Sequence, residues 1–135
     1  MRVVVPLVRT RDGRLLVSPH FGGATHYAII EVDRGECKIV DMLEAPPGIG
    51  GRGRIVAPWA YQHGAHAAVA KEMGWGAYEA FTAIGVRVYH AESLDPCEAA
   101  RAIAEGRAKP FTLEDVKESH RHRHNYGHHT HHDNS

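Results

Sequence analysis

The residues best suited to chemistry lie in a short loop around His20, between Ser18 and Gly23. The imidazole can bind a metal or donate a hydrogen bond, a proline before it fixes the backbone, and an aromatic residue and two glycines follow. Apolar runs that predict strands flank the loop, so we expect it at the edge of a sheet. Such loop positions carry binding more often than core positions do. The alternative is a turn in which Phe21 fills the core and His20 lies in water.

A second candidate is the glycine-rich stretch from Glu44 to Arg54. Its segment 48–53 matches G-x-G-x-x-G, but two prolines and a predicted hairpin precede it. A dinucleotide fingerprint instead joins the first strand of a β-α-β unit directly to its helix, so we expect no dinucleotide site. Successive backbone N–H groups, with Arg52 and Arg54 before a helix, could bind an anion. A mobile loop without a ligand is the alternative.

Histidine is concentrated near the end of the sequence. Seven of the 12 histidines fall in the segment 118–135, namely His120, His122, His124, His128, His129, His131 and His132. Neutral imidazole binds divalent nickel, copper or zinc. The residues between the histidines offer no apolar surface that could offset the entropy of ordering. We therefore predict a tail that binds a divalent metal and is disordered without it; a tag-like artefact is the alternative.

The two cysteines, Cys37 and Cys97, are far apart in the sequence and form no C-x-x-C motif. Neither a zinc site nor a disulfide framework is implied, so we expect both to be reduced and mostly structural. Cys97 follows Asp95 and Pro96 at a predicted helix start, where the helix dipole favours a thiolate. A reactive or ligating role for Cys97 therefore stays open.

Length and composition indicate one globular domain. The chain has 135 residues, of which 43% are hydrophobic, as expected for a fold with a single core. Its 16 basic and 16 acidic residues balance, so it lacks the positive field of nucleic-acid binders. The apolar run Val3 to Val8 is broken by Pro6 and is too short for a signal sequence or a membrane span. We expect a cytoplasmic protein without nucleic-acid or membrane partners.

The elements that must position these candidates alternate between strands and helices. Val3 to Val8 predicts a central strand covered on both faces. A hairpin and then alternating helices and strands follow, at Tyr27–Val32, Glu36–Leu43, Ile55–His63, Ala65–Lys71, Ala77–Ile84, Val86–His90 and Asp95–Gly106. This order predicts an α/β layer fold with a mixed sheet and right-handed crossovers.

One of these elements contradicts its own propensity. Ala65 to Met73 is rich in residues that favour helix. However, Gly64 ends the preceding helix, Gly74 to Gly76 predicts a turn, and another helix follows. We therefore predict a buried parallel strand over Ala65 to Lys71, beside Val3 to Val8.

Several of these segments together resemble the dinitrogenase iron-molybdenum cofactor biosynthesis family, the NifX-like and NafY-like accessory domains. They are Ser18–Gly22, Tyr27–Leu43, Met73–Phe81 and Gly85–Tyr89, and the similarity covers roughly residues 1 to 108. The resemblance implies a ribonuclease-H-like three-layer α/β/α fold whose five-stranded mixed sheet has the order 3-2-1-4-5 with strand 2 antiparallel. We expect this domain to span residues 1–117, followed by the tail at 118–135.

The same resemblance implies a non-catalytic protein that binds or carries iron-sulfur or iron-molybdenum cofactor species during metallocluster assembly. Its partners would be the cluster and the proteins that donate or accept it. Of the residues of this chain, the resemblance marks His20 as the best candidate ligand. Because ligands of open α/β sheets gather outside the strand ends where loops converge, we also expect the His20 loop and the glycine-rich loop to form one anionic-ligand site at the same end of the sheet. The candidate residues are His20, Phe21, Gly22, His26, Gly50, Gly51, Arg52 and Arg54. Relatives often have Arg-Ala-Pro where this chain has Gly23 to His26, which removes a cation and adds an imidazole. The body lacks the set of cysteines that would hold a cluster tightly, which favours transient carriage.

The sequence also bears on two other functions, a nuclease and a metal-handling protein. A nuclease would need clustered carboxylates for two-metal chemistry, usually including one on the first strand, and Val3 to Val8 has none. We therefore expect no enzyme. The remaining alternative is a metal-handling protein that binds nickel, zinc or copper through its tail and uses the body as a docking scaffold.

Overall fold

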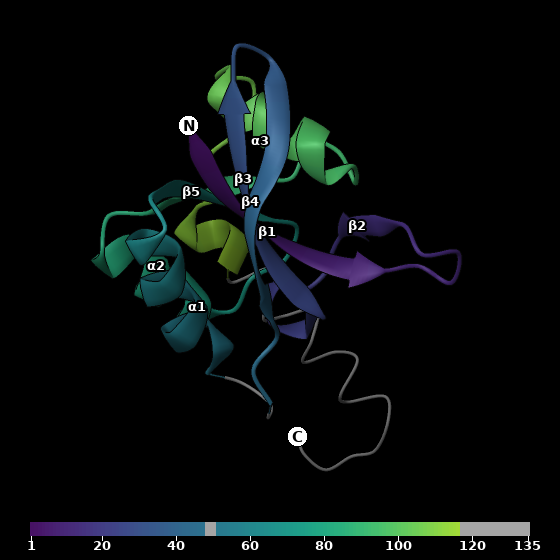
Figure 1. Ribbon diagram of the computed structural model, residues 1–135. Helices are drawn as coiled ribbons and strands as arrows, with labels where there is room; N and C mark the ends of the chain where they lie inside the picture. Colours follow the sequence, from purple (N-terminus) through teal and green to yellow (C-terminus); the bar gives the residue numbers. More distant parts are fainter. Residues whose placement is uncertain (48–50, 117–135) are drawn as a thin grey trace.

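A six-stranded mixed sheet forms the centre of the molecule (Figure 1). The computed structural model describes residues 1–47 and 51–116. Its strands are β1 (Arg2–Arg9), β2 (Leu15–Val17), β3 (His26–Asp33), β4 (Glu36–Glu44), β5 (Ala65–Ala70) and β6 (Arg87–His90). They lie in the order β4-β3-β1-β5-β6, with β2 also paired to β1. The five longer strands thus follow the predicted order, and β3 is antiparallel to β1 as predicted.

The predicted number of strands was wrong by one. The additional strand is β2, only three residues long, which pairs antiparallel with the end of β1. Between the turn at Gly13 and the loop at Ser18, the sequence predicts only a short extension over residues 15–17 and no separate strand. A three-residue strand is too short to show an alternating pattern, so its pairing with β1 could be recognised only in three dimensions.

Strand β1 is the buried central strand that its valines predict. Val3, Val4, Val5 and Leu7 are fully buried. Pro6 is unusual in a central strand because proline cannot donate a ladder hydrogen bond. On one side of β1, residues 2–4 pair with β5 and residues 7–9 pair with β2. Pro6 lies between these two pairings, at a position where β1 pairs with neither β2 nor β5. Its missing N–H group therefore interrupts neither ladder.

The predicted strand at Ala65 to Lys71 is confirmed as β5, which runs parallel to β1. Its residues are covered on both faces of the sheet. Ala68 and Ala70 contribute to one hydrophobic cluster, and Ala67 and Val69 contribute to the other. Burial between two layers therefore overrides the helical propensity of alanine.

Helices cover both faces of the sheet. The helices α1 (Arg52–Gln62) and α2 (Trp75–Ala83) pack over one face, and α3 (Pro96–Ala104) packs over the other (Figure 1). A short 3-10 turn, η1 (Phe21–Gly23), follows the His20 position. Asp95 caps α3, because its carboxylate accepts hydrogen bonds from the backbone N–H groups of Cys97 and Glu98. None of the helices in the described part of the chain is long and apolar enough to cross a membrane.

The first two helices begin earlier than predicted. Helix α1 starts at Arg52 rather than Ile55, so Pro58 lies inside the helix and not in its first turn. Helix α2 starts at Trp75 rather than Ala77. Both errors have one cause: the prediction took nearby glycines as loop residues, whereas these glycines occupy N-cap and first-turn positions.

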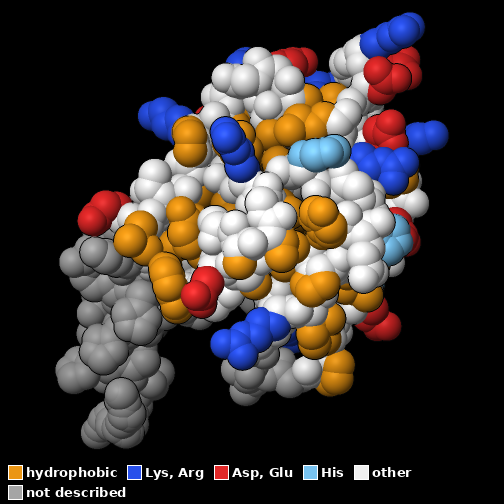
Figure 2. All heavy atoms as spheres, turned by 90° about the vertical axis from the view of Figure 1, so that its left-hand side faces the viewer, with side chains coloured by type: hydrophobic (Ala, Val, Ile, Leu, Met, Phe, Trp, Pro, Cys, Tyr) orange, Lys and Arg blue, Asp and Glu red, His pale blue; other side chains and the backbone are white. Residues whose placement is uncertain are grey.

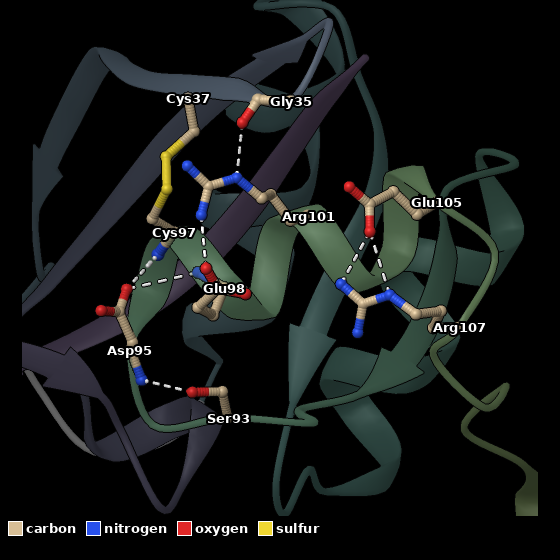
Figure 3. A network of polar contacts seen from close by, with 9 residues as sticks. All are labelled: Gly35, Cys37, Ser93, Asp95, Cys97, Glu98, Arg101, Glu105 and Arg107. Carbon is tan, nitrogen blue, oxygen red and sulfur yellow. Dashed lines mark hydrogen bonds and ion pairs between the residues drawn. A yellow bond between two sulfur atoms is a disulfide. The ribbon is translucent and has the colours of Figure 1, made fainter.

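The prediction of two reduced cysteines was also wrong. Cys37 of β4 and Cys97 of α3 form a disulfide, with their Cα atoms 6.0 Å apart (Figure 3). Sixty residues separate them in the sequence, and no local motif indicates the pairing. Strand β4 and the start of α3 meet only because α3 packs over the face of the sheet that carries Cys37.

Candidate functional site

A cavity of about 440 Å³ lies where α1 and α2 begin. Its wall consists largely of backbone, because five of its nine lining residues are glycines. The lining residues are Gly22, Gly51, Arg52, Gly53, Arg54, Gly74, Trp75, Gly76 and Ala77. The cavity therefore brings a residue of the His20 loop together with the first turns of two helices.

Both helices reach this cavity without side-chain caps. The N-cap residues are Gly51 for α1 and Gly74 for α2, and neither helix has an acidic residue in its first turn. The first N–H groups of a helix lack partners within the helix, and the helix dipole places partial positive charge there. Two such ends beside one cavity favour an anionic ligand.

Gly53 allows the two helix starts to lie side by side. A Cβ atom placed on Gly53 would come within 2.4 Å of the Cα of Ala77 and 2.7 Å of its Cβ. No side chain fits at such a distance. The cavity thus depends on a backbone contact between α1 and α2 that only glycine permits.

Gly22 and Gly76 have a different reason to be noted. A Cβ on either residue would meet no atom of residues 1–47 or 51–116 within 4 Å, and neither glycine has a positive φ. Packing and backbone conformation therefore do not require glycine at these two positions. Both line the cavity, where the absence of a side chain leaves space and exposes backbone N–H groups.

Arg52 holds the His20 loop against α1. Its Nη1 donates hydrogen bonds to the carbonyl oxygens of Gly22 (2.7 Å) and Ala24 (2.9 Å). The Nε atom of Arg52 is buried, with no hydrogen-bond partner in the described part of the chain. The Arg54 side chain is exposed and makes no hydrogen bond or ion pair with residues 1–47 or 51–116. One arginine therefore has a mainly structural task, while the other is available to a ligand.

Tyr27 supports the same loop from within the core. Its hydroxyl donates a hydrogen bond of 2.7 Å to the carbonyl oxygen of Phe21. Burial raises the pKa of the Tyr27 hydroxyl, and the neighbouring Arg52 guanidinium only partly opposes this rise. Tyr27 thus stays protonated and keeps donating at all ordinary pH values.

His20 lies beside the cavity rather than in its wall. Its Nδ1 is 2.9 Å from Oε1 of Glu72, and nearly half of its side chain is exposed. The backbone N–H of Phe21 also donates to the carbonyl oxygen of Glu72, which ties the loop to the end of β5. Contact of Nδ1 with a carboxylate leaves Nε2 as the nitrogen that can bind a metal, an arrangement common among metal-binding histidines.

Other residues expected in the site lie elsewhere. The Phe21 side chain is only 1% exposed and packs against Tyr27 and Phe81, so it anchors the loop and cannot face the cavity. Side chains alternate along a strand, and Tyr27 of β3 lies on the α1 and α2 face. His26, its neighbour, therefore points to the opposite face and does not line this cavity.

Some predicted residues fall outside the described part of the chain. They are Gly50 and the seven tail histidines, His120, His122, His124, His128, His129, His131 and His132. Within residues 1–47 and 51–116, no group of three or more histidine, cysteine, aspartate or glutamate residues could hold a metal ion.

Trp75 and Gly76 were missed as lining residues. The two glycines at Gly74 and Gly76 predict a turn, but the sequence also carries a signal for a site. Both helices begin with the same pattern, Gly-Arg-Gly at residues 51–53 and Gly-Trp-Gly at residues 74–76. A repeated Gly-x-Gly at two helix starts could have indicated that both starts contribute to one site.

The cavity opens on the side of the molecule that carries α1 and α2. Figure 2 shows this side, where hydrophobic side chains gather between scattered charges. Ile55 of α1 and Trp75 of α2 are each more than half exposed. A ligand in the cavity would therefore have these apolar side chains nearby, in addition to the positively charged Arg54 and the two helix N-termini.

Comparison with known proteins gives consistent results. The chain matches the family described as "Dinitrogenase iron-molybdenum cofactor" over residues 1–106. The uncharacterised protein MJ0580 of Methanocaldococcus jannaschii is 29% identical over 113 residues, which cover 82% of this chain and 92% of that protein.

Two solved structures resemble the fold. The NMR structure of a Thermotoga protein, TM1290, described as a candidate NifB protein of the DUF35 family, is 28% identical, with a TM-score of 0.58 over 83% of this chain and 94% of that one. The apo orange protein of Desulfovibrio gigas has a TM-score of 0.61 over 81% of this chain and 94% of that one, and at 21% identity it supports the fold alone. Since the family match spans residues 1–106 of 135, the resemblance noted in the sequence is confirmed, and the chain belongs to the dinitrogenase iron-molybdenum cofactor family.

Proposed function

We propose that this protein binds and carries an anionic iron-sulfur or iron-molybdenum cluster species during metallocluster assembly, without catalysing a reaction. One observation carries the proposal: two helix N-termini without side-chain caps meet at one cavity of about 440 Å³. Backbone N–H groups of this kind are a recurring feature of phosphate and iron-sulfur sites. The family membership supports the same cargo.

The side chains around the cavity suit such a cargo. Arg54 supplies a positive charge that no described residue neutralises, and charge-assisted hydrogen bonds to an anion are the strong ones. His20 offers its Nε2 as a ligand from the rim, with Nδ1 held by Glu72. We propose His20 as the one imidazole of the body that contacts the cluster.

The arrangement favours transient rather than permanent binding. The chain has only two cysteines, and in this structure they are bonded to each other on the other face of the sheet. Clusters that proteins hold tightly are usually bound by several thiolates. A carrier that must release its cargo to a partner protein is better served by hydrogen bonds and a single imidazole. We further propose the ribonuclease-H-like class for this fold, supported by the strand order β4-β3-β1-β5-β6, and a cytoplasmic location.

Gly76→Ala is the decisive variant. The added methyl group meets no atom of the described residues within 4 Å, and alanine is favoured over glycine in a helix by up to about 1 kcal/mol. The variant should therefore be at least as stable as the wild type. It should nevertheless bind roughly tenfold more weakly, because the methyl group occupies the cavity and separates the cluster from the N–H groups of α2.

The experiment uses the full chain under anaerobic conditions. A synthetic iron-sulfur cluster and isolated iron-molybdenum cofactor are titrated into the wild type, Gly76→Ala and His20→Ala, followed by visible absorption and by iron retained after gel filtration. His66→Ala is the matched control, since His66 is exposed near the other end of β5. We expect weaker binding by the first two variants and wild-type binding by the control. Unchanged binding by Gly76→Ala and His20→Ala would remove the cavity from consideration.

A second proposal concerns the tail. We propose that the seven histidines between His120 and His132 bind divalent nickel, copper or zinc, since clustered imidazoles are good ligands for these ions. Only neutral imidazole binds, so uptake should fall as the pH drops through about 6.5. Nickel is titrated into the full chain and into a form ending at Lys117, at pH 7.5 and pH 5. Equal uptake by both forms, or uptake that ignores pH, would contradict the proposal.

A further inference from the structure

The Cys37–Cys97 disulfide lies across the sheet from the cavity and joins the edge strand β4 to the start of α3 (Figure 3). We propose that these two cysteines are a reversible thiol–disulfide pair, open to small dithiols and to dithiol proteins. Access to the sulfur atoms, the contacts that remain after reduction and the position of each cysteine support this role. The pair is independent of the function proposed for the cavity.

Both cysteines border solvent-accessible hollows. A hollow of about 290 Å³ is lined by Cys37 and Cys97 together with apolar residues that include Leu15 and Pro96. A second hollow, of about 250 Å³, is lined by Cys37 but not by Cys97. Neither cysteine is fully buried. A reductant can therefore reach the disulfide without unfolding of the domain, and it has more routes to Cys37.

Contacts other than the disulfide hold α3 in place. Ala99, Ala100 and Ile103 are buried in the hydrophobic cluster between α3 and the sheet. Arg101 of α3 donates a hydrogen bond of 2.6 Å from Nε to the carbonyl oxygen of Gly35, in the turn that leads into β4. After reduction these contacts keep the two thiols near each other, at a high effective concentration. The disulfide can thus form again in the same place.

Arg101 is the positioning residue of this pair. Its Nη1 also contacts the Glu98 carboxylate (Figure 3), which orients the guanidinium toward Gly35. Gly35 lies two residues before Cys37, and Arg101 lies four residues after Cys97, so the hydrogen bond spans the same gap as the disulfide.

The positions of the cysteines indicate the course of the exchange. Cys97 is the second residue of α3, where the helix dipole stabilises a thiolate; Asp95 and Glu98 oppose this effect, and Arg101 supports it. Cys37 lies in a strand, without a helix end of its own. Exchange is faster when the more stable thiolate leaves, so an incoming thiolate should attack Cys37 and displace Cys97.

The exchange is balanced by the reductant. The thiolate of a dithiol forms a bond to Sγ of Cys37, the disulfide bond breaks, and Cys97 leaves as a thiolate that takes up a proton. The second thiolate of the reductant then attacks the other sulfur of the reductant, which is bonded to Cys37 in the mixed disulfide. This step closes the disulfide of the reductant and releases Cys37 as a thiolate, which also takes up a proton. Two electrons and two protons pass from the dithiol to the protein, and the reductant becomes a disulfide.

The test is a redox titration of the folded full chain. The protein is equilibrated in buffers of reduced and oxidised dithiothreitol and then of glutathione, free thiols are trapped by alkylation, and each cysteine is followed by mass spectrometry. We expect both cysteines to be reduced in one two-electron step while the circular dichroism spectrum of the fold is retained. Oxidised glutathione should restore the disulfide, with any transient glutathione adduct on Cys37.

Arg101→Leu and Arg107→Leu form a matched pair. Arg107 pairs with Glu105 just beyond α3 and has no contact with Gly35 in the described structure. Arg101→Leu should lower the equilibrium constant for disulfide formation against glutathione several-fold, and Arg107→Leu should leave it unchanged. Reduction only after denaturation, loss of the fold on reduction, or stable glutathione adducts on both cysteines would each overturn the proposal.

Discussion

Replacing Gly53 with alanine tests the contact that brings the two helix starts together. The new Cβ would lie 2.4 Å from the Cα of Ala77, whereas carbon atoms in contact normally lie about 3.5–4.0 Å apart. Helix α1 or α2 would have to shift by roughly 1 Å to relieve the overlap. Because the overlapping atom, the Cα of Ala77, belongs to the backbone, no side-chain rotation can relieve the overlap.

The expected magnitude follows from two opposing effects. Overpacking of this kind costs about 1–3 kcal/mol, and the preference of helices for alanine over glycine returns up to about 1 kcal/mol. Gly53→Ala should therefore be less stable than the wild type by up to about 2 kcal/mol. Gly76→Ala makes the same chemical change at the equivalent position of α2, where the new Cβ would have no atom within 4 Å in the described part of the chain. It should gain stability, so the two variants should differ by about 1–3 kcal/mol.

Urea unfolding followed by circular dichroism measures this difference directly. Both variants should unfold with the slope of the wild type, so that the midpoints report stability alone. The reasoning is refuted if Gly53→Ala proves as stable as Gly76→Ala, since the close approach of α1 to Ala77 would then be absent.

Two further predictions concern side chains that stabilise the loops. Tyr27→Phe removes the hydroxyl that donates to the buried carbonyl oxygen of Phe21, and it should lower the free energy of unfolding by about 1–2 kcal/mol in urea titrations; a loss below the error of the measurement would contradict this hydrogen bond. Burial raises the pKa of Asp115, but hydrogen bonds from Thr112 and His90 outweigh that effect and leave the pKa below its usual value of 3.8. Because its pKa is lowered in the folded protein, the charged Asp115 carboxylate stabilises the fold at pH values above 3.8. This stabilisation is lost as the pH falls below 3.8 toward the lowered pKa of the folded state. Asp115→Asn should thus melt at a lower temperature than the wild type at pH 7, with a gap that narrows toward pH 3; a constant gap would show that the charge is irrelevant.

The order of the elements could be predicted from the sequence where local signals and the overall fold agree. The valines of β1 predict a buried strand directly, and Gly35 in the turn between β3 and β4 is typical of a hairpin. Strand β5 needed more, because alanine favours helix. The glycines at Gly64 and Gly74 left room only for a strand between two helices, so the positions of breakers outweighed propensity.

The site could be predicted only in part. The sequence selects His20, Arg52 and Arg54 from two segments that the fold brings together, since Arg52 contacts the His20 loop. The role of Gly53 was hidden, because a close approach to Ala77 is a long-range contact that leaves no local pattern. The disulfide was missed for the same reason, since Cys37 and Cys97 become neighbours only when α3 packs on the sheet.

Trp75 gives the cavity a reporter of its own. Its indole is half exposed in the cavity wall, while the chain's other tryptophan, Trp59, lies farther along α1 against His63. An indole at such a boundary between apolar and polar surroundings responds to whatever displaces the water beside it. Its fluorescence should therefore follow the filling of the cavity for any cargo, coloured or colourless, and in a Trp59→Phe background the signal would come from that single position.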